Sequence, residues 1–142
     1  MSDGSQNGSD LGHGTRLSPK EYERQIVALY VGLPSSPSKE EEIGIRRREL
    51  DLTIDHRLGQ DFPKDRREAL WNIQQRVEKK RLRLMFHWLL HFISYKPLYS
   101  RANKLAGYLV DEYAKVLTKD ELHAYFNLEE NERPTLPIDK LK

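Results

Sequence analysis

The sequence predicts an all-α protein, a small bundle of about five helices. Apolar residues recur at spacings of three and four over most of the chain, which is the period of an amphipathic helix. Three segments open with Ser or Thr followed three residues later by Glu, a pattern typical of a helix N-terminus. No segment shows a convincing alternation of apolar and polar residues, as a half-buried strand would.

The bundle is predicted to surround one long central helix over residues 63–95. Pro63 suits the first helical position because its missing N–H has no helical partner there, and neither Gly nor Pro follows before Pro97. One face of this helix carries apolar residues at spacings of three, four or seven, namely Leu70, Ile73, Val77, Leu84, Trp88 and Phe92. At about 1.5 Å rise per residue the helix would be about 48 Å long. We expect its first half to bury one face and its second half to be covered nearly all round.

Two shorter helices are predicted before the central one. The first begins after Ser18, which is followed by proline and, three residues on, by glutamate, and it ends near Gly32. The second begins after Ser38, where the same spacing of serine and glutamate recurs. It ends at Gly59, because glycine readily adopts the left-handed conformation that terminates helices.

Two further helices are predicted after the central one. Pro97 disfavours helical geometry in the residue before it, so the central helix should stop near Tyr95. The next helix should begin at Leu98 or Ser100. A short fifth helix should follow Thr118, which again has glutamate three residues later.

One domain is predicted, over residues 17–128. Residues 1–16 are mostly Ser, Gly, Asn and Asp, so we expect a disordered N-terminal tail, and residues 129–142 should form an extended C-terminal tail with two prolines. The N-terminus has no secretory signal pattern and no apolar stretch is long enough to span a bilayer. With no cysteine present, we expect a soluble, cytoplasmic protein without an integral membrane segment.

No catalytic or metal-binding pattern is complete. His87 and His91 are spaced as zinc ligands on one helix face, but Trp88 stands where metalloproteases have glutamate. Asp51 and Asp55 share a face, as a carboxylate pair for acid–base chemistry would, yet arginines one turn earlier explain them equally as surface ion pairs. We therefore expect no enzyme activity, no cofactor and no metal site.

The predicted function is recognition of a protein partner, or of a second copy of the chain. The candidate surface is an aromatic patch near the end of the central helix, formed by Phe86, Trp88, Phe92 and Tyr95. The apolar run from Leu84 to Tyr95 holds more apolar surface than one small bundle readily covers. The alternative, that neighbouring helices enclose these side chains, stays open from the sequence.

A basic stripe predicts a second function, nucleic-acid binding. Its residues fall at i, i+3, i+4 and i+7 of the central helix and are Arg76, Lys79, Lys80 and Arg83. A phosphate backbone would bind such a stripe, with an affinity that falls steeply as salt rises. No helix-turn-helix or RNA-binding signature accompanies the stripe, so a solvated helix face is the competing interpretation.

Overall fold

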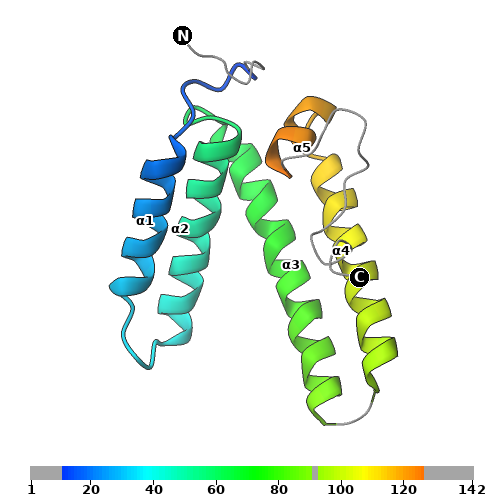
Figure 1. Ribbon diagram of the computed structural model, residues 1–142. Helices are drawn as coiled ribbons and strands as arrows, with labels where there is room; N and C mark the ends of the chain where they lie inside the picture. Colours follow the sequence, from blue (N-terminus) through cyan, green and yellow to red (C-terminus); the bar gives the residue numbers. More distant parts are fainter. Residues whose placement is uncertain (1–10, 91–92, 127–142) are drawn as a thin grey trace. The chain divides into compact units, whose positions relative to one another are not determined.

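The computed structural model describes residues 11–90 and 93–126, and within them the chain is all-helical, with no strand (Figure 1). The helices are α1 (Pro19–Val31), α2 (Lys39–Arg57), α3 (Lys64–Leu89), α4 (Tyr95–Ala114) and α5 (Lys119–Tyr125). The predicted all-α fold class is therefore confirmed. The expected C-terminal tail over 129–142 lies outside the described residues.

The chain divides into two compact units between Arg67 and Glu68, inside α3. Unit 1 holds α1, α2 and the first turn of α3, and unit 2 holds the remainder of α3 together with α4 and α5. The prediction of one domain over residues 17–128 stays a prediction.

In unit 1, α1 and α2 pack side by side as an antiparallel hairpin (Figure 1). The Tyr22 hydroxyl lies 3.0 Å from Thr53 Oγ1, and the Tyr22 ring stacks on the His56 ring with centroids 4.5 Å apart. His56 Nδ1 lies 2.7 Å from the Leu17 carbonyl oxygen. The buried apolar side chains of this unit are Leu50, Leu52, Ile54, Leu58 and Phe62.

Part of the N-terminal tail predicted over residues 1–16 is held by backbone hydrogen bonds to the segment after α2. Within the tail expected over residues 1–16, the His13 carbonyl accepts a 2.7 Å hydrogen bond from Asp61 N, and the Thr15 carbonyl accepts one of 3.1 Å from Gln60 N. Gly59 permits this close approach: its φ is +135°, and a Cβ there would lie 2.3 Å from the His13 oxygen. Backbone hydrogen bonds thus order a segment that lacks a large apolar content. Residues 1–10 lie outside the described part of the chain.

In unit 2, α3 and α4 run antiparallel, side by side (Figure 1). Three contacts set their register: Gln74 Nε2 donates to the Tyr113 hydroxyl at 2.6 Å, Arg76 meets Glu112 at 3.1 Å, and Lys80 Nζ lies 5.2 Å from the centre of the Tyr108 ring. Residues with higher numbers on α3 thus contact residues with lower numbers on α4, as antiparallel helices do. Positions near 83 and 87 of α3 are therefore opposite positions near 104 and 101 of α4.

The short helix α5 packs on α4 through aromatic side chains. The buried Tyr113 ring lies 5.2 Å from the Tyr125 ring and 5.7 Å from the Phe126 ring, measured between centroids. Thr118 and Glu121 form the predicted capping box, in which Glu121 accepts from Thr118 N at 2.8 Å. The aromatic cluster therefore lies at the C-terminal end of α4.

The central helix is shorter than the predicted 63–95. It ends at Leu89, so its 26 residues span about 39 Å, and Tyr95 opens α4 instead of closing α3. Pro97 stands in the first turn of α4, where its missing N–H has no helical partner and its ring meets no preceding turn. The proline therefore starts the following helix, and Leu98 and Ser100 lie inside it.

Candidate functional site

Large apolar side chains are exposed where α3 ends and α4 begins. Phe86 is 60% exposed, Trp88 37% and Tyr95 63%, so three of the four predicted patch residues are accessible, and Phe92 lies outside the described residues. The structure adds three leucines to the same region, Leu82, Leu89 and Leu90. We call these six side chains the apolar end: Leu82, Phe86, Trp88, Leu89, Leu90 and Tyr95.

Most of the apolar end belongs to one face of α3. Leu82, Phe86 and Leu89 are spaced i, i+4 and i+7 on α3, and Leu90, which directly follows the helix, continues this stripe at i+8. This stripe lies on the side of α3 away from Val77 and Leu84, which face α4 in a groove between the two helices. The expectation that the second half of the helix is covered nearly all round is therefore wrong for this face, because α4 packs on one side of α3 only.

An apolar groove of about 480 Å³ runs between α3 and α4. Val77, Leu84 and Met85 line it from α3, and Leu98, Leu105 and Leu109 line it from α4. Tyr95 lines the groove and is also part of the apolar end, so the two surfaces are continuous. The charged residues at its edge, Glu78 and Arg81, pair with each other at 2.7 Å, so this groove presents almost no net charge.

The four residues of the predicted basic stripe have different surroundings, and only two of them lie together in a groove beside α4. Arg76 is held by Glu112 at 3.1 Å. The hydrogen bond that Arg76 makes with Tyr108 raises the pKa of the guanidinium, and Glu112 adds to the rise. Lys79 does not line either groove beside α4. Of the four predicted residues, Lys80 and Arg83 lie together in a second groove, of about 400 Å³.

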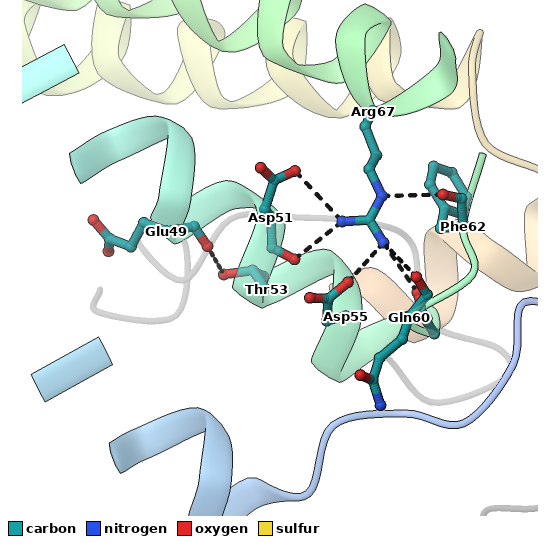
Figure 2. A network of polar contacts seen from close by, with 8 residues as sticks. Glu49, Asp51, Thr53, Asp55, Gln60, Phe62 and Arg67 are labelled. Atoms are coloured by element: carbon teal, nitrogen blue, oxygen red, sulfur yellow. Dashed lines mark hydrogen bonds and ion pairs between the residues drawn. The ribbon is translucent and has the colours of Figure 1, made fainter. Parts of the chain in front are cut away.

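The pair Asp51 and Asp55 is engaged by one arginine from the first turn of α3 (Figure 2). Arg67 lies 2.6 Å from Asp55 Oδ1 and 3.4 Å from Asp51 Oδ1, and its Nε donates to the Phe62 carbonyl at 3.0 Å. Its Nη2 also donates to the Gln60 carbonyl at 3.2 Å. The partner is thus Arg67, and not the arginines one turn earlier that the sequence suggested. The pair serves to hold the α2–α3 connection.

The histidine pair is not assembled within the described residues. His87 lines the second groove, and His91 lies outside the described part of the chain. Across residues 11–90 and 93–126, no three His, Cys, Asp or Glu side chains come together as a metal site would require. Over the same residues, no helix has both the length and the apolar content needed to cross a membrane.

Comparison with protein-family models, with curated proteins and with solved structures finds no match to this chain. Within the described part of unit 2, the apolar end with its adjoining groove and the basic second groove are two surfaces of distinct chemistry.

Proposed function

We propose that the protein is a non-enzymatic interaction module that binds a helix of a protein partner through the apolar end. The observation that carries this proposal is the exposure of Phe86, Leu89 and Tyr95, each at least 60% accessible, within ten residues of one another. Soluble proteins rarely leave a contiguous apolar surface of this kind unless a partner covers it.

The spacing of the apolar end favours a helical partner. A stripe at i, i+4, i+7 and i+8 matches the ridge that a second amphipathic helix presents along its own axis. The adjoining groove offers space between α3 and α4 for further apolar anchors, and the Glu78–Arg81 pair at its edge adds no net charge. We infer that the partner helix is predominantly apolar on its contacting face.

The engagement of the Asp51 and Asp55 carboxylates by Arg67 supports a non-enzymatic role, because a catalytic pair needs access to a substrate. We place the module in the cytoplasm as part of the same proposal. The absence of cysteine from the sequence fits a reducing compartment.

A comparative pull-down tests the proposal. The full chain, a Phe86→Ser/Leu89→Ser variant and a Val27→Ser/Val31→Ser variant are immobilised and exposed to native extract. Val27 and Val31 are exposed on α1, so the second variant removes a similar apolar area elsewhere. We expect a defined protein to be retained by the full chain and by the α1 variant. Its retention by the α3 variant should fall at least about ten-fold, a loss of about 1.4 kcal/mol, which truncation of central interface residues commonly exceeds.

Equal retention by all three proteins would contradict the proposal, because the apolar end would then contribute nothing to binding. Sedimentation across a range of protein concentrations identifies the case in which the partner is a second copy. In that case the full chain and the α1 variant associate, and the α3 variant stays monomeric.

A further inference from the structure

The second groove gathers cations from both helices of unit 2. On α3 its lining residues are Lys80, Arg83 and His87, and on α4 they are Arg101, Lys104 and Tyr108. Each set is spaced i, i+3 and i+7, so each forms one row along its helix. Leu84 and Leu105 lie between the rows.

The antiparallel register places the two rows opposite each other. Lys80 lies over the Tyr108 ring at 5.2 Å, so one turn further along α3 Arg83 is opposite Lys104, and a turn beyond that His87 is opposite Arg101. Four cationic side chains thus border a groove of about 400 Å³.

Among the described residues, no carboxylate pairs with the four cations of this groove. Its lining residues include no carboxylate. Within residues 11–90 and 93–126, none of Lys80, Arg83, Arg101 and Lys104 forms an ion pair. On α4, Glu112 is paired with Arg76 and, at 2.6 Å, with Lys115. Like charges facing each other repel, and an anion bound between them relieves that repulsion.

We propose that this groove binds the phosphate backbone of a single-stranded nucleic acid. Lys80 and Arg83 on one wall and Arg101 and Lys104 on the other contact successive phosphates. The aromatic side of Tyr108 and the apolar floor formed by Leu84 and Leu105 face the sugars and bases. A positively charged groove with an aromatic side chain is the arrangement that single-strand binders use without reading sequence.

The aromatic side chain in the groove favours a single strand over other anions. The unpaired bases of a single strand can stack on the Tyr108 ring, whereas the bases of a duplex are paired and a bilayer surface has none. An acidic peptide has carboxylates in place of phosphates and lacks bases that stack on a ring. The inference rests on different residues from those of the apolar end and is independent of the proposed protein partner.

Fluorescence anisotropy with a labelled oligouridylate and the full chain tests the inference. Four phosphate contacts predict a slope of log affinity against log salt of about −3, so that binding is about 50-fold weaker at about 200 mM salt than at about 50 mM. The Phe86→Ser/Leu89→Ser variant should bind with unchanged affinity, because it leaves the second groove intact.

A matched pair of charge reversals locates the site. Lys80→Glu/Lys104→Glu alters the groove, and Lys79→Glu/Lys96→Glu alters one exposed lysine beside it on each helix. Each Lys→Glu change lowers the charge by two, so both variants take the formal net charge from +2 to −2. The groove variant should lose at least about ten-fold in affinity and about half of the salt slope, whereas the control should keep the slope and most of the affinity. Circular dichroism confirms that both variants are folded.

Three results would overturn the inference. The first is no binding at about 50 mM salt, where the electrostatic contribution is largest. The second is an equal loss of affinity in the two charge-reversal variants, which would mean that only net charge matters. The third is equal or tighter binding to a duplex of the same length, to phosphatidylserine vesicles or to polyglutamate, because these ligands share the charge but have no unpaired bases to stack on the Tyr108 ring.

Discussion

Arg67 is the side chain that fixes the turn between α2 and α3 in unit 1. Its guanidinium contacts two carboxylates of α2 and the backbone carbonyls of the connection, and its side chain is only 13% exposed. The planar fork of an arginine satisfies several acceptors at once, which a lysine at this position would not do. Removing it takes away the guanidinium that both Asp51 and Asp55 contact.

We predict that Arg67→Met lowers the free energy of unfolding by about 2–4 kcal/mol, because partly buried carboxylates and carbonyls lose their charged donor. Urea unfolding followed by circular dichroism measures the change. Arg48→Met is the control, since Arg48 is exposed on α2, and it should change the value by less than about 0.5 kcal/mol. Similar losses in the two variants would show that Arg67 acts only as a surface charge.

Tyr113 carries a buried hydroxyl that accepts from Gln74 at 2.6 Å. Burial raises the pKa of this phenol above its ordinary value of 10.0, because the phenolate is poorly solvated inside the unit. The folded state therefore keeps a proton that the unfolded state releases. The protonated Tyr113 hydroxyl therefore contributes its full share of stability below about pH 10, and this contribution is lost as the pH rises beyond that value.

We predict that the loss of stability between about pH 8 and about pH 11 is smaller in Tyr113→Phe than in the unaltered chain, by about 1 kcal/mol. The measurement is the free energy of unfolding in urea at the two pH values. Tyr30, whose pKa is also raised through its hydrogen bond with Glu49, is retained in both proteins and cancels in the comparison. An identical alkaline loss would mean that Tyr113 titrates normally.

At the level of helices, the N-terminal signals predicted the starts well. Ser38 and Thr118 form reciprocal capping boxes. Ser18 caps α1 but is only half of such a box, because the Glu21 carboxylate binds Arg24 and Gln25 instead of the Ser18 N–H. The pattern of Ser or Thr followed by Glu thus starts a helix in each case. Whether the glutamate side chain completes the capping box depends on the donors one turn later in the helix, which for Glu21 are Arg24 and Gln25.

The boundary between α3 and α4 was predicted less well. A proline is found both just after the end of a helix and in the first turn of a helix. Pro97 alone therefore does not show where α3 ends and α4 begins. The exposure of the apolar end was also open from the sequence. Phe86 and Leu84 are both apolar, so the sequence does not distinguish them. Because α4 packs on one side of α3, Leu84 lines the groove between the two helices and Phe86 stays exposed.

We predict that Phe86→Ser changes the free energy of unfolding by less than about 0.5 kcal/mol, because the Phe86 side chain is largely exposed in the free protein. Leu70→Ala on the same helix should cost about 2–5 kcal/mol, since Leu70 is fully buried. Thermal or urea unfolding of the two variants provides the comparison. A large loss in Phe86→Ser would mean that the apolar end is part of the core.

For the molecule as a whole, composition and periodicity predicted the fold class but not the arrangement of the surfaces. The sequence identified Lys80 and Arg83 within a stripe on one helix. It did not indicate Arg101 and Lys104, which are about twenty residues away and reach the same groove only through the antiparallel register of α3 and α4. It also grouped Arg76 with the stripe, although Glu112 of α4 binds it. Contacts between distant residues therefore decide which charges act together.

The most direct test of the interaction surface is photo-crosslinking in living cells. Benzoylphenylalanine replaces Phe86 in one protein and Val31, which is exposed on α1, in another. We predict that irradiation joins the probe at position 86 to one defined protein, either a partner or a second copy, and yields no such product from position 31. The absence of a product at position 86, or the same products from both positions, would contradict the account.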